Sequence, residues 1–108
     1  MTSQHDKTHQ NTVDSVVNLL SEKYGIETSV PYFNQHTSER GEMDIVATTG
    51  DKRLIFEVKS AHSELHYQKA VEQLKRSRRY YEYMMPHLKT FLYYVGNLRD
   101  GLIVREVK

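Results

Sequence analysis

Apolar residues recur with a helical period near the start of the chain and again beyond its middle. The first helix face has the i, i+3, i+4, i+7, i+11 spacing and consists of Val13, Val16, Val17, Leu20 and Tyr24. Asn11 or Thr12 is placed to cap its start, and Gly25 stands where a helix commonly ends. Residues 1–10 are polar without an apolar period, which predicts a flexible arm.

The rest of the chain predicts five strands around one long helix. The strands are expected at Ile26–Phe33, Met43–Thr48, Leu54–Lys59, Thr90–Val95 and Leu102–Val107. Pro31 favours an edge position for the first of them. The helix is expected at Tyr67–Met85, before Pro86, with a buried stripe of Ala70, Leu74, Ser77, Tyr81 and Met85. The predicted order is α-β-β-β-α-β-β.

Length and composition narrow the possible classes of protein. A chain of 108 residues predicts a single domain. The absence of cysteine excludes disulfides, thiolate metal sites and cysteine nucleophiles, and zinc would have only histidine and carboxylate ligands. No apolar run reaches the ~20 residues of a membrane span, and no apolar signal segment is found. We therefore expect an intracellular, cytoplasmic protein that makes no use of a membrane, in the host-cell cytoplasm if viral.

Positive charge is concentrated in the long helix, although the net charge of the whole chain is only +1. Residues 69–79 carry five basic side chains against Glu72, a local net charge of +4. Such a stretch is suited to facing phosphates. On its own it is more typical of a solvated helix face.

The second and third predicted strands carry the residues with the clearest chemistry. Strand alternation puts Leu54, Phe56 and Val58 on a core face. Glu57 and Lys59 then share the other face, roughly 6–7 Å apart along the strand. With a tight turn at Gly50-Asp51, Asp44 can approach Glu57. Two carboxylates that close repel each other, and a divalent cation relieves the repulsion.

A divalent cation in such a hairpin would support phosphodiester hydrolysis. Mg²⁺ takes one or two carboxylates, keeps several waters and accepts phosphate oxygens. Water on the metal is more acidic and can attack phosphorus. Lys59 could orient that water or stabilise the charge that builds up in the transition state. An acid-x-lysine triplet is nevertheless common on strands, so the triplet alone also fits an ordinary strand end.

The motif Gly41-Glu42-Met43-Asp44-Ile45-Val46, followed by Phe56-Glu57-Val58-Lys59, resembles the PD-(D/E)xK, or restriction-endonuclease-like, nuclease superfamily. The resemblance covers residues 41–59 by motif and 11–108 by element order. It implies an α/β fold with an αβββαβ core, in which helices flank a mixed central sheet. Met43 departs from the proline that gives the superfamily its name. The implied domain organisation is an arm at residues 1–10 and one nuclease domain at 11–108.

The resemblance also implies roles for individual residues. Asp44 and Glu57 become ligands of Mg²⁺, with Mn²⁺ as a substitute, and the backbone carbonyl of Val58 completes the metal shell. Lys59 becomes the catalytic lysine. Relatives often add an acid from the first helix, and Asp14 stands in a similar place. Asp14 could equally serve only to stabilise the helix N-terminus electrostatically.

The long helix supplies candidates for substrate binding. Similar nucleases use a glutamine from this helix near the site; Gln73 matches it, with Gln68 as the alternative. Lys69, Arg76 and Arg79 are further candidates for contact with DNA phosphates, and Tyr80 is a candidate for stacking on unpaired bases. The tyrosines of this helix are also typical of half-buried core or of a dimer surface.

Together these features predict a metal-dependent DNA endonuclease. Its resemblance to small Holliday-junction resolvases implies a homodimer with structure-specific cutting or low sequence specificity. One alternative is a non-catalytic DNA-binding or assembly module of the same fold. Another is an interaction domain that uses its tyrosine-rich helix as a dimer face.

Overall fold

Seven elements follow one another in the order that the hydrophobic pattern predicts. The computed structural model describes residues 4–99 and 101–108. Its helices are α1 (Gln4–Leu20) and α2 (Glu64–Met84). Its strands are β1 (Gly25–Phe33), β2 (Arg40–Thr49), β3 (Lys52–Lys59), β4 (Lys89–Leu98) and β5 (Gly101–Val107).

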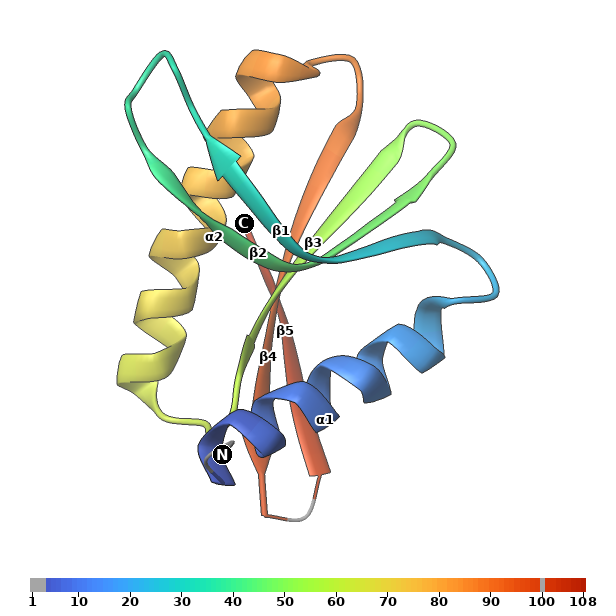
Figure 1. Ribbon diagram of the computed structural model, residues 1–108, viewed down its shortest axis with the longest axis vertical. Helices are drawn as coiled ribbons and strands as arrows, with labels where there is room; N and C mark the ends of the chain where they lie inside the picture. Colours follow the sequence, from blue (N-terminus) through green and yellow to red (C-terminus); the bar gives the residue numbers. More distant parts are fainter. Residues whose placement is uncertain (1–3, 100) are drawn as a thin grey trace.

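The strands form one mixed sheet in the order β1-β2-β3-β4-β5, as Figure 1 shows. Neighbours joined by short loops are antiparallel, whereas β3 and β4 are parallel because α2 carries the chain back between them. The predicted α/β class is therefore confirmed. Pro31 lies in β1, which is an edge strand, as its missing N–H favours.

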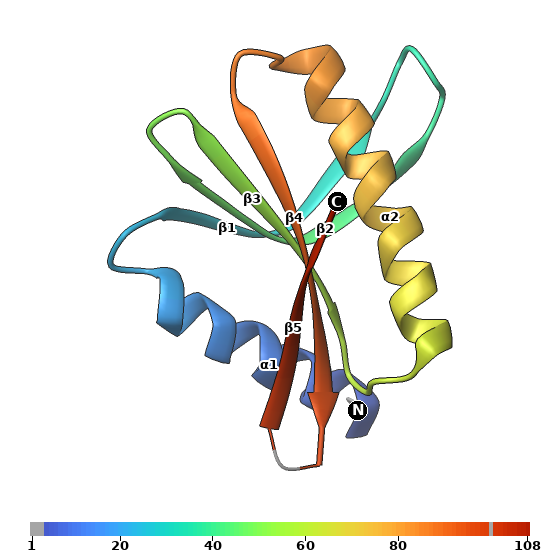
Figure 2. The same cartoon turned by 180° about the vertical axis from the view of Figure 1, so that it is seen from behind.

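The two helices cover opposite faces of the sheet (Figures 1 and 2). Under α1, Val13 and Val16 pack with a cluster that includes Phe56 and Val58 of β3. Under α2, Ala70 and Leu74 pack with a second cluster of sheet residues, which includes Met43, Val46, Ile55, Leu92 and Tyr94. The central strand β3 is therefore buried on both faces. Neither helix, within the described residues, has the length and apolar character needed to cross a membrane.

The first helix begins earlier than predicted. Residues 4–10 are helical and not a flexible arm, and residues 1–3 lie outside the described part of the chain. Asn11 and Thr12 lie inside α1, so neither caps it; the Thr12 hydroxyl instead donates to the carbonyl of Thr8 at 2.8 Å. Because neither glycine nor proline occurs within Gln4–Leu20, no residue of this stretch interrupts the helix.

The second helix keeps most of its predicted buried stripe. Ala70, Leu74 and Ser77 are buried, and Tyr81 is half-buried. Met85 was predicted to extend the stripe, but it follows the helix with non-helical φ and ψ and is 40% exposed. Pro86 explains this end, because a proline disfavours helical conformation in the residue before it. At the other end, Ser63 caps the helix by accepting from the backbone N–H of His66.

Candidate functional site

Asp44 lies where β2 and β3 separate. Their pairing runs from Thr49 opposite Lys52 to Ile45 opposite Phe56. One position further along β2, the Asp44 carboxylate accepts a hydrogen bond from the backbone N–H of Val58 at 2.7 Å. The side chain thus supplies an acceptor where the ladder of backbone hydrogen bonds ends, and this bond fixes its orientation. Figure 1 shows the N-terminal part of β2 turning away from the C-terminal part of β3.

The other neighbour of β2 is irregular at the same point. The register between β1 and β2 pairs Thr28 with Ile45 and Val30 with Met43, and it skips Ser29 and Asp44. Ser29 has a φ of 51°, in the left-handed region that non-glycine residues rarely adopt. Such strain is concentrated at functional sites, where surrounding structure maintains it.

Gly41 has a packing role that its place in the motif does not reveal. It lies opposite Tyr32 in the sheet, and a Cβ at this position would come within 3.0 Å of the Tyr32 ring. A contact of this length is tight, and the Tyr32 ring would have to give by a few tenths of an ångström to admit a side chain. The close approach of this ring is therefore a packing reason for glycine at position 41.

Glu57 is a buried carboxylate beside a second carboxylate. It is 6% exposed, and its side chain shares the α2 face of β3 with Ile55. Burial, and after it the charge of Asp44, raise the pKa of Glu57 to about 8, while the ammonium of Lys59 acts in the opposite direction. The Lys59 Nζ lies 3.6 Å from Glu57 Oε1. The folded protein therefore favours the neutral, protonated form of Glu57 unless a cation compensates its charge.

Lys59 is positioned by the helix that crosses above it. Its Nζ donates to Gln73 Oε1 at 2.7 Å. Of the two glutamines considered from the sequence, Gln73 is thus the one that contacts the strand triplet. Gln68 lies nearer the N-terminus of α2, where it lines a groove that Lys59 also lines.

Two neighbouring hollows meet at Lys59. A cavity of about 250 Å³ is lined by His9, Glu57, Val58, Lys59, Ser60, His66 and Lys69. A groove of about 460 Å³ runs along α2 and is lined by Lys59, Leu65, Gln68, Lys69, Glu72, Gln73 and Arg76. Lys59 and Lys69 line both, so a cationic surface connects the groove to the buried acids. A phosphate chain lying along α2 could reach the acids by this route.

His9 is a site residue that the sequence analysis missed. Its Nε2 lies 3.5 Å from Asp44 Oδ1. The signal was present: His9 precedes Val13 and Val16 at the i, i+4, i+7 spacing of one helix face. A helix predicted to begin after residue 10 leaves His9 outside this face, whereas α1 begins at Gln4.

The structure does not bring Asp14 to the carboxylate pair. Asp14 is exposed on α1 and accepts a hydrogen bond from Gln10 Nε2 at 2.9 Å. It follows Val13 directly, about 100° further around the helix from the face that packs on the sheet. It also lies in the third turn of a helix that begins at Gln4, too far inside for the expected electrostatic role at the N-terminus.

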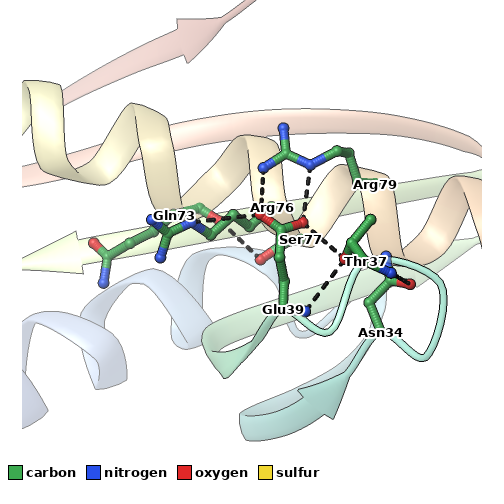
Figure 3. Close-up of polar contacts among 7 residues, drawn as sticks. All are labelled: Asn34, Thr37, Glu39, Gln73, Arg76, Ser77 and Arg79. Atoms are coloured by element: carbon green, nitrogen blue, oxygen red, sulfur yellow. Dashed lines mark hydrogen bonds and ion pairs between the residues drawn. The ribbon is translucent and has the colours of Figure 1, made fainter.

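The arginines predicted to contact DNA are engaged by a carboxylate from another element (Figure 3). Glu39, in the loop between β1 and β2, accepts from Arg79 Nε at 3.0 Å and from Arg79 Nη2 at 2.7 Å. Arg76 Nε lies 3.7 Å from the same carboxylate. The paired arginine holds the pKa of Glu39 below its ordinary value. This contact was not expected from the sequence, where the loop and α2 are far apart.

A compact turn holds Glu39 in this place. The buried Asn34 side chain accepts from the backbone N–H groups of His36 and Thr37. The backbone N–H of Asn34 in turn donates to the Glu39 carbonyl at 2.8 Å. The Thr37 hydroxyl donates to Glu39 Oε1 at 3.1 Å (Figure 3). The loop is therefore built to present a carboxylate to α2.

Tyr80 lies away from the cavity and packs against other aromatic rings. It is half-buried, with its ring centroid 5.3 Å from that of Tyr32 and 5.1 Å from that of Tyr81. This placement agrees with the alternative of half-buried core for Tyr80 and Tyr81, whereas Tyr83 is 53% exposed. Lys69, in contrast, lines both the cavity and the groove.

Oxygen donors suited to Mg²⁺ are present at the separation of β2 and β3. Mg²⁺ uses one or two protein carboxylates together with water, which matches Asp44, Glu57 and the Val58 carbonyl. The raised pKa of Glu57 reflects a negative charge that a cation would neutralise. Among the residues that the structure describes, no three histidine, aspartate or glutamate side chains form a ready-made metal cluster. Two carboxylates and one carbonyl would leave the other positions of an octahedral ion to water, as Mg²⁺ prefers.

Comparison with known proteins leaves these observations to stand on their own. No protein-family model matches the chain, and a search of curated proteins found no significant match.

Proposed function

We propose that this protein is a metal-dependent DNA endonuclease that hydrolyses phosphodiester bonds. The observation that carries the proposal is the meeting of Asp44, Glu57, Lys59 and Gln73 at one end of β3. Their contacts join the separating hairpin to the helix above it. A buried glutamate next to a half-buried aspartate and a positioned lysine is unusual for a structural site and common at catalytic ones. The mixed sheet with its β3-α2-β4 crossover supports the finer proposal of a restriction-endonuclease-like fold.

The chain's own residues divide the chemical tasks. Asp44, Glu57 and the Val58 carbonyl would hold Mg²⁺, which when bound supplies an acidified water and neutralises charge on the phosphate. Asp44 is oriented for this by the backbone N–H of Val58. Lys59, held by Gln73, is placed to stabilise negative charge on the phosphate oxygens.

The substrate we propose is DNA, contacted through its backbone. Lys69 lines both the cavity and the groove, and Arg76 lines the same groove along α2. Contacts of this kind give affinity without choice of sequence, which favours structure-specific or low-specificity cutting. A homodimer would bring two such sites to two strands, and we propose action on DNA in the cytoplasm.

The proposal is tested by cleavage of supercoiled plasmid and of a four-way junction in Mg²⁺. Asp44→Ala, Glu57→Ala and Lys59→Ala are each expected to lose cleavage, because each removes one of the groups assigned above. Asp14→Ala is the matched control: it removes an exposed aspartate from α1 and should cleave normally. Undiminished cleavage by all three site variants would reject the assignment. Binding of DNA without cleavage by the wild type, in Mg²⁺ and Mn²⁺, would instead support a non-catalytic DNA-binding module.

A further inference from the structure

The outer part of the β1–β2 hairpin, residues 30–43, lies beside α2 and extends away from α1 (Figures 1 and 2). It begins where the register skips Ser29 and Asp44, so that each strand has one unpaired residue there. Beyond this point Val30, Tyr32 and Met43 pack in the cluster under α2. The side chains that alternate with them therefore point to the face of the hairpin opposite α2.

This opposite face carries an exposed aromatic ring next to a guanidinium group. Phe33 and Arg40 are partners in the register, and the guanidinium carbon lies 5.2 Å from the centroid of the ring. Phe33 is 45% exposed, so part of its ring is open to solvent. The two side chains border a hollow of about 540 Å³. The hollow is lined by Pro31, Tyr32, Phe33, Arg40, Gly41 and Glu42.

The chemistry of this hollow suits a nucleobase. Bases that have left the duplex stack on aromatic rings and on the planes of arginine side chains. The charge of Arg40 also attracts the phosphate next to such a base. Glu42 lines the same hollow, and a carboxylate can accept hydrogen bonds from the amino group of a base. A base inside a duplex is covered by its neighbours, so an unpaired base is the fitting occupant.

The hollow lies along β2 from the acids of the proposed nuclease site. Glu42 and Arg40 precede Asp44 by two and four residues, roughly 7 and 13 Å along the strand. Nucleotides of one stacked DNA strand follow one another about every 3.4 Å. A base in the hollow would therefore lie within about four nucleotides of a phosphate at Asp44.

We propose that the hollow at Phe33 and Arg40 binds an unpaired nucleobase of the DNA substrate; the inference rests on the proposed function. Phe33 supplies the stacking surface, and Arg40 binds beside it with its plane and its charge. The grooves along α2 bind the backbone of any DNA, whereas the hairpin distinguishes DNA with unpaired bases from a fully paired duplex. This contact narrows the substrate to DNA in which unpaired bases lie close to the phosphate that is cut.

Tyr83 provides a matched control for the aromatic ring. It is 53% exposed, yet it belongs to α2 and does not line the hollow. Its ring stacks on that of His36, with centroids 5.3 Å apart and an interplanar angle of 13°. Removal of the Tyr83 ring therefore tests the loss of an exposed aromatic residue outside the proposed base site.

The experiment measures DNA binding by the full chain without divalent metal, so that no strand is cut. Fluorescence anisotropy compares a duplex that contains a short run of unpaired thymines with the same duplex fully paired. Phe33→Leu should weaken binding of the first DNA ~10-fold or more and change binding of the second less than about threefold. Phe33→Tyr, which keeps a ring, and Tyr83→Leu should bind both DNAs like the wild type. Thermal melts confirm that each variant folds.

Photocross-linking identifies the contact itself. With 5-iodouracil in place of one unpaired thymine, irradiation should join that base to Phe33, as located by mass spectrometry. Phe33→Leu should lose this cross-link and Phe33→Tyr should keep it. A cross-link to another residue in the wild type would overturn the assignment of the base to this hollow.

The outcomes separate this inference from the proposed function. If the wild type binds both DNAs and Phe33→Leu weakens neither, the hollow is not a base site and the nuclease proposal stands. If Phe33→Leu weakens both DNAs equally, the ring only supports the hairpin, and the base-binding role is overturned. If the wild type binds neither DNA at low salt, the proposed substrate fails together with the inference.

Discussion

Two charged residues, Arg53 and Glu57, are buried on the same face of β3, one near each end, and their surroundings differ. Arg53 is 2% exposed, and its guanidinium carbon lies 3.6 Å from the centroid of the Tyr81 ring. Its nitrogens also lie 3.5 Å from the Thr90 hydroxyl and 3.4 Å from the sulfur of Met85. Glu57 is as deeply buried, but its neighbours include another carboxylate and an open cavity.

The comparison distinguishes Arg53, whose charge has a structural role, from Glu57, whose charge we propose acts on a ligand. An aromatic face compensates a buried cation well when water is excluded. A second carboxylate does the reverse for a buried glutamate and raises its pKa. Because folding alone gives no reason to place a buried glutamate beside a second carboxylate, we propose that the Glu57 end of β3 is the functional end.

The largest expected effect comes from exchanging each buried charge for a neutral side chain of similar shape. Glu57→Gln should lower the rate of DNA cleavage by ~10³-fold, because it removes a charge from the proposed metal site. Arg53→Met should leave the rate within about threefold, since Arg53 has no part in the chemistry. Single-turnover cleavage measures both rates. Equal losses in the two variants would erase the contrast between the ends of β3.

The second-largest expected effect is a loss of stability on substitution of Arg53, at the other end of β3. Arg53→Ala should lower the free energy of unfolding by about 2–4 kcal/mol, because it removes the contact with Tyr81 and leaves a hole in the core. Arg53→Met should cost less, since an apolar side chain of similar length fills the same space. Urea unfolding of both variants compares them. A destabilised Arg53→Met variant alongside an unaffected Arg53→Ala variant would contradict the packing explanation.

The pH dependence of stability should report Glu57 directly. The folded protein holds the Glu57 proton up to a pKa of about 8, whereas the unfolded chain releases it near ~4.3. Between these values the folded state binds more protons, so the free energy of unfolding falls as pH rises, by up to about 1.4 kcal/mol per pH unit. The contribution is constant below this window and above it.

Urea unfolding between about pH 5 and pH 9 measures this slope, and Glu57→Gln is the control that should remove it. Saturating Mg²⁺ should flatten it as well, because a bound cation favours the ionised carboxylate. An identical slope in the wild type and in Glu57→Gln would show that Glu57 titrates normally.

The smallest expected effect concerns an exposed carboxylate. Glu39→Gln should tighten DNA binding a few-fold at low salt, because it releases Arg76 and Arg79 for phosphates. Fluorescence anisotropy measures the affinity. Glu22→Gln makes the same change in net charge between α1 and β1 and should have less effect. Equal gains in both variants would mean that only net charge matters, and high salt should diminish either gain.

Local patterns in the sequence predicted a large part of the fold. The element order, the edge position of Pro31 and the burial of Ala70, Leu74 and Ser77 were all readable, because each depends on the period of a single helix or strand. The nearness of Glu57 and Lys59 was predictable for the same reason. The start of α1 and the position of Met85 were not, because the ends of helices depend on weak local preferences.

The sequence by itself determined the acid pair, the lysine and the basic helix. Strand alternation alone places Glu57 beside Lys59, and the helical period alone groups the residues of α2. Tertiary structure decided which residues join them. His9 meets Asp44, Gln73 meets Lys59 and Glu39 meets Arg79 only because separate elements pack on one sheet. These contacts span 35, 14 and 40 residues, and no local period encodes a distance of that kind.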